Sequence, residues 1–382
     1  MSAPLGLRRM LPRDPAEAHR ASSDLELFFD LTFAVAIAVA AEQLAALLPH
    51  GPAAAAFGYC SVFFGVWWAW MNFTWFASAF DTDDWLYRVL TILQMTGVLV
   101  FAAGIPAAMQ HFDYRVGTAG YVLMRLAGVS QWIRASGNAD YRLTARRYAI
   151  GVSIVQAGWL LRLLVPAAFG VPTFLVLVLA ELAVPVLAER TRVTPFHPRH
   201  IAERYGLFTL IVLGEGLVAT TQAMIGALGA ADRVAPLLGV AAAALVIVAG
   251  MWWIYFAREQ ADNLTSMAAT FGFGYLHYAI FAAAGALAAG IEVALEQAGA
   301  HPVLPDAVAR AATTVPVAVF VLGVWVLALR RTVARSTSAV VLALSVLIAA
   351  SALVPAGLAV TAVLVVAIVV ALELDARRRP QE

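Results

Sequence analysis

The sequence contains no lysine, and all 25 of its basic residues are arginines. A Schiff base to a chromophore or pyridoxal group and a Walker A phosphate loop both require a lysine, so this chain provides neither. Transport driven by ATP hydrolysis in this chain alone is therefore not expected. The net charge of +1 says little about partners. We predict no cofactor and no nucleic-acid partner.

Cysteine and charged residues are also scarce. The single Cys60 cannot form an intramolecular disulfide, and it lies in an apolar run where we expect it to pack. Apolar residues make up 62% of the chain and charged residues 13%, whereas soluble domains have roughly 45–50% and about 25%. Apolar runs of about 18 residues or more recur throughout. The composition predicts an all-α polytopic membrane protein.

Segments long and apolar enough to span a bilayer can be placed along the whole chain. The N-terminal residues have no apolar core of the signal-peptide type, so we expect no cleavage there. Proline and glycine between 353 and 357 suit a tight turn, although a single kinked helix over 337–374 is an alternative. The predicted spans are 25–48, 54–80, 85–110, 114–135, 146–166, 171–189, 203–226, 235–257, 267–295, 306–330, 337–353 and 355–374.

Arginine placement predicts how these twelve helices are oriented. With a cytoplasmic N-terminus, the cytoplasmic tails and loops carry 20 arginines, Arg204 among them, while the outer loops carry 3, Arg115, Arg233 and Arg310. This distribution follows the positive-inside rule. An odd number of helices would place Arg377–Arg379 outside. We therefore expect an even number, with both termini in the cytoplasm.

Two segments of the chain resemble each other. Trp67-Trp68 matches Trp252-Trp253 at an offset of 185, and Ala103-Gly104-Ile105 matches Ala289-Gly290-Ile291 at an offset of 186. Duplication of this kind is typical of transporters, whose working site lies between the halves. Six helices in each half predict two parallel repeats. The predicted divisions are a cytoplasmic tail at 1–22, repeats at 23–190 and 203–376, a linker at 191–202 and a second tail at 377–382.

Ionisable residues inside the predicted spans are the candidate functional residues. Each costs about 2.5–3.5 kcal/mol on insertion scales, so each calls for an explanation. Together with one amide they form a candidate path for protons, ions or substrate. The set comprises Asp30, Glu215, Arg125, Glu26, His277, Glu181 and Asn72.

Glu26 and Asp30 are four residues apart and therefore share one face of the first helix. Two carboxylates this close repel each other, which favours the binding of a proton or a cation. The alternative is helix capping, because Ser22 and Ser23 precede an acidic first turn. We favour capping for Glu26 and the functional interpretation for the deeper Asp30.

Glu215 lies about twelve residues into its span, roughly 18 Å along the helix and near the middle of a bilayer. A buried glutamate there suits a proton carrier, and an internal ion pair with Arg125 is an equal alternative. His277 is either a proton relay or, more often for such a residue, a hydrogen-bonded packing residue. Glu181 lies near Pro185, where polar groups could satisfy a distorted helix.

The segment between the halves contains His197, His200 and Glu203, whose spacing places them on one helical face. These residue types can bind a metal, but Pro198 interrupts the segment and no further ligand cluster accompanies it. We therefore predict no metal site and expect a juxtamembrane face.

Three motifs together resemble the bacterial low temperature requirement protein A family over roughly residues 20–375. The resemblance implies a polytopic protein of the bacterial inner membrane and adds more to the topology than to the mechanism. The motifs are Glu26-Leu27-Phe28-Phe29-Asp30-Leu31, Trp67-Trp68 followed by Asn72-Phe73, and Glu203-Arg204-Tyr205-Gly206-Leu207-Phe208 followed by Leu213-Gly214-Glu215.

These features favour a secondary transporter or channel driven by an ion or proton gradient. Asp30 would bind the cation or proton, Glu215 would carry protons, and Arg125 would supply the counter-charge. Expected partners are membrane lipids, protons or cations, and a small-molecule substrate. One alternative is an intramembrane enzyme or binder for a lipid-like substrate, using Glu215, His277 and Asp30 as acid–base groups. It is less expected, because HExxH and GxSxG motifs are absent. A sensor or scaffold is a third class.

Overall fold

The computed structural model describes residues 6–14, 17, 20–229, 234–264, 266–298 and 304–378. Within these ranges the chain consists of helices and their connections and contains no strand. Arg233 and Arg379, both used in the arginine count, lie outside the described residues, as do parts of both predicted tails.

The helices follow one another with short connections. Most of the predicted spans begin or end within a few residues of an observed helix. The elements are α1 (Asp24–Leu47), η1 (Leu48–His50), α2 (Pro52–Phe80), α3 (Trp85–His111), α4 (Arg115–Ala135), α5 (Arg142–Arg162), η2 (Ala167–Phe169), α6 (Gly170–Ala188), α7 (Pro198–Gly229), α8 (Val234–Phe256), η4 (Ala261–Asn263), α9 (Met267–Ala298), α10 (Asp306–Val324), η5 (Trp325–Leu329), α11 (Arg330–Thr332), α12 (Arg335–Ala350), η6 (Ser351–Leu353) and α13 (Gly357–Arg377).

Nine helices in the described part of the chain are long and apolar enough to cross a membrane. The protein is therefore a multi-pass membrane protein. The long helices α4, α5 and α7 are not among the nine. The predicted count of twelve spans thus depends on whether these three polar helices also lie in the bilayer.

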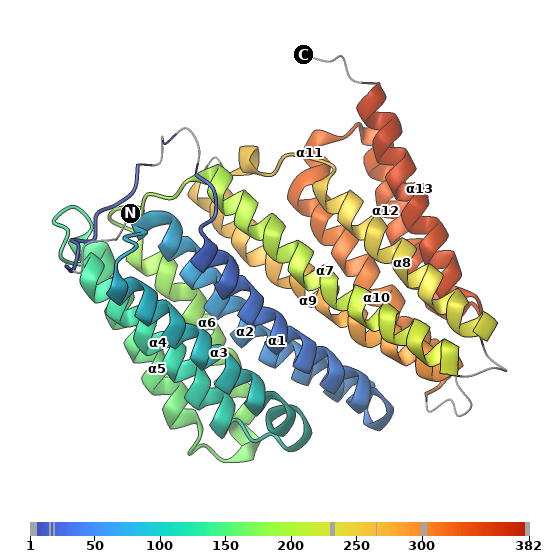
Figure 1. Cartoon of the computed structure of the whole chain (residues 1–382), viewed down its shortest axis with the longest axis horizontal. Coiled ribbons are helices and arrows are strands. Elements are labelled where there is room, and N and C mark those ends of the chain that lie inside the picture. The colour runs from blue at the N-terminus through green and yellow to red at the C-terminus, as the bar shows by residue number, and fades with distance from the viewer. Residues whose placement is uncertain are drawn as a thin grey trace. The chain divides into compact units, whose positions relative to one another are not determined.

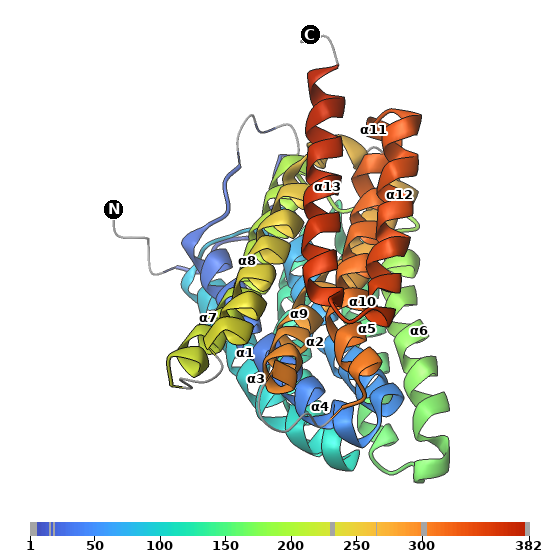
Figure 2. The same ribbon diagram turned by 90° about the vertical axis from the view of Figure 1, so that its right-hand side faces the viewer.

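Residues 335–377 form two helices rather than a single kinked one. α12 ends at Ala350, η6 follows, and α13 begins at Gly357. Pro355 lies in the turn, where its missing N–H and fixed φ break the helix. α12 and α13 then pack against each other, which Figure 2 shows.

The chain divides into two compact units. The first contains residues 1–36 and 65–204. In it α3 packs on α4, α4 on α5 and α5 on α6, and these four helices lie side by side in Figure 1. α3 and α4 approach closely at Gly104, where a Cβ atom would overlap the backbone of Gly117. Glycine at this position therefore permits the close helix crossing.

The second unit contains residues 37–64 and 205–382. In it α9 packs on α10, α8 on α13, and α10 on α12. α9 and α10 meet at Gly290, where a Cβ atom would overlap the backbone of Ala312. The close crossings at Gly104 and Gly290 thus involve two glycines that the sequence comparison aligned.

α6 has one exposed apolar face and one buried face. Leu175, Val176 and Leu179 are exposed on it, whereas Glu181 and Val184 are buried. Exposed apolar side chains on a membrane helix imply contact with lipid. Glu181, on the buried face, therefore has its carboxylate inside the first unit.

Candidate functional site

The start of α1 is fixed by a capping box. The backbone N–H of Ser23 donates to Glu26 Oε2 over 2.8 Å, and the backbone N–H of Glu26 donates to Ser23 Oγ over 3.4 Å. This reciprocal pair satisfies two N–H groups that the first helical turn leaves free. The predicted capping role of Glu26 is therefore present in the structure. Its second oxygen, Oε1, remains for ionic contacts.

A buried arginine of α7 holds the two carboxylates of α1. Arg204 Nη1 donates to Glu26 Oε1 over 2.8 Å, while its Nη2 and Nε donate to the two oxygens of Asp30 over 2.6 and 3.1 Å. Asp30 also accepts a hydrogen bond of 2.7 Å from Trp70 Nε1. Glu26 is 1% exposed, and Asp30 and Arg204 are fully buried. One guanidinium group thus binds both acids of the predicted pair.

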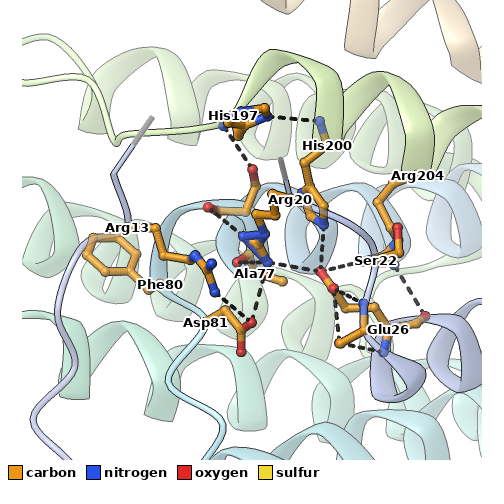
Figure 3. Close-up of polar contacts among 12 residues, drawn as sticks. Arg13, Arg20, Ser22, Glu26, Ala77, Phe80, Asp81, His197, His200 and Arg204 are labelled. Atoms are coloured by element: carbon orange, nitrogen blue, oxygen red, sulfur yellow. Dashed lines mark hydrogen bonds and ion pairs between the residues drawn. The ribbon is translucent and has the colours of Figure 1, made fainter. Parts of the chain in front are cut away.

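Further charges surround this centre, as Figure 3 shows. Arg20 is buried and lies 3.6 Å from Glu26 and 3.5 Å from Asp81. Arg13 also contacts Asp81, over 3.3 Å. Burial raises the pKa of the Asp81 carboxyl, despite these two arginines. We call the group the Arg204 cluster, and it consists of Arg13, Arg20, Glu26, Asp30, Asp81, His200 and Arg204.

The Arg204 cluster balances three carboxylates with three guanidinium groups. Its remaining member, His200, lies 3.2 Å from Glu26 through Nε2. Both oxygens of Asp30 accept from Arg204, so a proton or cation bound to Asp30 would weaken that pair. The cluster is therefore a set of linked ion pairs, and Arg13 extends it to Glu17 over 2.7 Å.

His197, just before α7, and His200, in its first turn, are both buried. His197 Nε2 lies 2.8 Å from the carbonyl oxygen of Glu17, and its backbone N–H donates to Ser78 Oγ over 3.1 Å. His200 packs into the Arg204 cluster. Local spacing did not reveal these contacts with the N-terminal segment, which is far away in the sequence. The juxtamembrane position of this segment stays a prediction.

A second buried carboxylate lies in the middle of the first unit. Glu181 Oε1 accepts hydrogen bonds from Tyr121 Oη over 2.7 Å and Trp159 Nε1 over 3.2 Å, and Oε2 accepts from Trp68 Nε1 over 2.8 Å and Arg125 Nη2 over 2.7 Å. We call these five residues the Glu181 cluster. Four donors, one of them the positively charged guanidinium of Arg125, therefore hold this carboxylate.

The partner of Arg125 is therefore Glu181. Their N–O distance is 2.7 Å, and both side chains are buried. This acid differs from Glu215, which the sequence suggested as one alternative partner, because the sequence offered several acids and no way to rank their distances.

Further polar side chains follow Arg125 on α4, at Gln131 and Arg134. Gln131 donates through Nε2 to the carbonyl oxygen of Tyr87 over 3.4 Å and accepts from Arg134 Nη1 over 3.2 Å. Arg134 Nη2 in turn donates to Asp84, the N-cap of α3, over 2.5 Å. These residues help to explain why α4 is less apolar than α3.

A small cavity of about 30 Å³ lies against this face of α4. Its polar lining comes from Asn72, Gln94, Arg125 and Gln131, with Gly128 between the last two on α4. A cavity of this volume has room for about two waters. The structure therefore places two predicted residues, Asn72 and Arg125, at one polar cavity.

The family model described as bacterial low temperature requirement A protein (LtrA) matches residues 21–372. The chain belongs to this family. The matched range includes Glu26, Asp30, Arg204 and all of the Glu181 cluster. An uncharacterized protein of Rhizobium meliloti is 26% identical to this chain over 245 residues, which are 62% of this chain and 58% of that protein. The chain thus spans less than two thirds of the length of this relative.

The other two predicted residues of this LtrA-family protein lie in the second unit. His277 is fully buried, with Nδ1 2.7 Å from the carbonyl oxygen of Phe273 and Nε2 2.9 Å from Tyr255 Oη. Both ring nitrogens are thus engaged, which agrees with the packing interpretation. Glu215 is half-buried and forms no hydrogen bond or ion pair with any residue that the structure describes.

Sequence analysis missed Arg204, the residue that joins Glu26 and Asp30. The arginine count placed it among cytoplasmic loop residues, but it lies inside α7 and is fully buried. It is therefore not evidence for orientation. A signal was present, because two acids on one buried helical face require a basic partner. Gln94 and Gln131 gave no such signal, since isolated glutamines do not mark a cavity.

Proposed function

We propose that this LtrA-family protein is a secondary transporter or channel for protons or cations, and that the Arg204 cluster takes part in ion movement. The observation that supports this is the sharing of Arg204 by Glu26 and Asp30 within α1, which is one of the nine apolar helices. Buried ion pairs contribute little net stability, since desolvation offsets their attraction. Charged residues within membrane helices commonly mark ion pathways.

In this mechanism Asp30 binds the proton or cation and Arg204 is the counter-charge. Neutralising Asp30 removes one of the two acids that hold Arg204, so the guanidinium shifts toward Glu26. Arg20, which lies 3.6 Å from Glu26, must then move as well. Binding of one charge is thereby coupled to rearrangement of side chains from α1, α7 and the N-terminal segment.

We also propose the number, arrangement and orientation of the membrane helices. Twelve membrane helices would form two parallel repeats with both termini in the cytoplasm of a bacterial inner membrane. The shared use of Gly104 and Gly290 at close helix crossings supports the repeat. Glu215, half-buried and without a described partner, is the candidate second proton carrier. α4 would enter the bilayer because its polar face lines a cavity rather than contacting lipid.

The test is ion movement into proteoliposomes that enclose a pH-sensitive or cation-sensitive dye. We expect proton or cation entry along an imposed gradient with the wild-type protein and loss of most of it with Asp30→Asn. The matched control is Asp83→Asn, since Asp83 forms only an exposed ion pair with Arg88. The proposal is rejected if the wild type moves no ion, or if folded Asp30→Asn moves ions as fast as the control.

A second candidate is the binding of a lipid-like amphiphile in the second unit. A pocket of about 460 Å³ is lined mainly by apolar residues of α8, α9, α10 and α13, together with Asp306, Arg310 and Thr313. Ala243 lines this pocket, and Ala243→Trp would fill part of it. Native mass spectrometry should then show loss of bound lipid in the variant. Equal lipid retention by both proteins would exclude this site.

A further inference from the structure

The cavity beside α4 presents hydrogen-bond donors without partners. Arg125 Nε and Gln94 Nε2 make no hydrogen bond within the part of the chain that the structure describes, and both side chains are only 6% exposed. A buried donor that stays unpaired costs about 1–3 kcal/mol, and more when it is charged. Two such donors around one cavity therefore indicate a missing acceptor.

Two other amide side chains of the lining donate to protein groups. Asn72 donates through Nδ2 to the carbonyl oxygen of Trp68 over 2.8 Å. Gln131 uses its amide nitrogen and its oxygen in bonds to Tyr87 and Arg134. Within the described residues the lining thus offers two unpaired donors, Arg125 Nε and Gln94 Nε2, and donors favour an anion over a metal cation.

No carboxylate of the described chain lines this cavity. Glu181 binds Arg125 through Nη2 and is occupied by three further donors. This ion pair holds the guanidinium through Nη2 and leaves Nε without a partner among the described residues. The site therefore combines a guanidinium donor, an amide donor and a described wall without a carboxylate.

We infer that this cavity binds a small monovalent anion, of about the size of chloride, between Arg125 Nε and Gln94 Nε2. Room for about two waters accommodates an atomic anion but excludes a carboxylate metabolite or phosphate ester. Aromatic residues Phe73, Phe76 and Trp132 supply the rest of the wall. The site is independent of the proposed transport activity, because it is defined by equilibrium binding.

Bromide is the probe that tests this site. The purified protein is prepared in detergent with gluconate as the only anion, and bromide is then titrated at constant ionic strength while thermal unfolding is followed. Anomalous scattering from bromide-containing crystals locates the ion. We expect a saturable rise in unfolding temperature and an anomalous peak between Arg125 and Gln94.

Two variants change the cavity in different ways. Gln94→Leu removes one donor and should weaken bromide binding by roughly 10- to 100-fold, since a hydrogen bond to a charged group contributes about 1.5–3 kcal/mol. Gly128→Ala adds a methyl group at a lining position where a Cβ atom meets nothing within 4 Å, so the protein should fold with a bulkier lining. Bromide binding should then weaken. Gly272→Ala, in equally open surroundings on α9, is the control.

Several results would overturn the inference. They are an anomalous map without a bromide peak in the cavity, ordinary water density there at saturating bromide, or a bromide effect that survives both Gln94→Leu and Gly128→Ala. Ion flux without bromide binding would reject this site and leave the proposed transport intact. Bromide binding without any ion flux would support this site and reject the proposed transport.

Discussion

Removing Arg204 should destabilise the first unit strongly. Arg204→Met leaves Glu26 and Asp30 buried without the guanidinium that now binds them at 2.8 and 2.6 Å. Breaking a buried ion pair from one side costs about 3–5 kcal/mol, because the remaining charge is uncompensated. We expect a loss of about this size in the free energy of unfolding, since all three residues are at most 1% exposed.

Removing the acids as well should restore most of the stability. In the triple variant Arg204→Met, Glu26→Gln, Asp30→Asn, neither acid remains as a buried charge without the guanidinium of Arg204, and Arg20 keeps its contact with Asp81. The large penalty of the single variant comes from uncompensated buried charge, which the triple variant avoids at these two acids. The triple variant should therefore be more stable than Arg204→Met alone.

The assay is equilibrium unfolding of the purified variants in mixed micelles, followed by tryptophan fluorescence or circular dichroism. Arg88→Met is the matched control, because Arg88 forms an exposed pair with Asp83. Its effect should stay within about 0.5 kcal/mol, as for most surface substitutions. The reasoning is refuted if Arg204→Met behaves like this control, or if the triple variant is less stable than the single one.

Four further predictions concern the first unit and the helix crossing at Gly290 in the second. Gly104→Ala and Gly290→Ala should each destabilise by about 1–3 kcal/mol, because the new methyl group overlaps the facing helix. Gly128→Ala should instead be neutral or stabilising by up to about 1 kcal/mol in the same unfolding assay, as helical glycine is unfavourable. Trp70→Phe should cost about 1.5–3 kcal/mol by removing a donor to a charged carboxylate, and unchanged thermal unfolding would contradict this. Burial alone would raise the pKa of the Asp84 carboxyl, but hydrogen bonds from two backbone N–H groups and a guanidinium lower it. Asp84 therefore stabilises the fold above its unfolded pKa of about 3.9, and this contribution disappears as pH falls further. The stability difference between wild type and Asp84→Asn should shrink over that acidic range, and a constant difference would contradict the assignment.

Apolar runs and turn residues predicted the helices well, because the length of an apolar segment is a local property. The uncertain turn near Pro355 resolved into a break between α12 and α13. The number of membrane spans is harder to predict from the sequence. α4 carries the buried Arg125 and is much less apolar than α6, whose exposed face is apolar, so hydropathy favours α6 over α4 as a span.

The candidate site could be predicted only in part. The spacing of Glu26 and Asp30 on one face of α1 identified two members of the Arg204 cluster. Partners were harder to assign, since Arg204 is 174 residues from Asp30 in the chain and Glu181 is 56 from Arg125. Pairing across such separations depends on helix packing. Patterns within one segment cannot determine it.

The central claim is that charge movement through this protein depends on Asp30 and its pair with Arg204. The most direct measurement is the initial rate of proton or cation entry into liposomes containing Asp30→Asn, compared with liposomes containing the same amount of folded Asp83→Asn. The account predicts that Asp30→Asn retains little of the rate while Asp83→Asn matches the wild type. Equal rates for the two variants would contradict it.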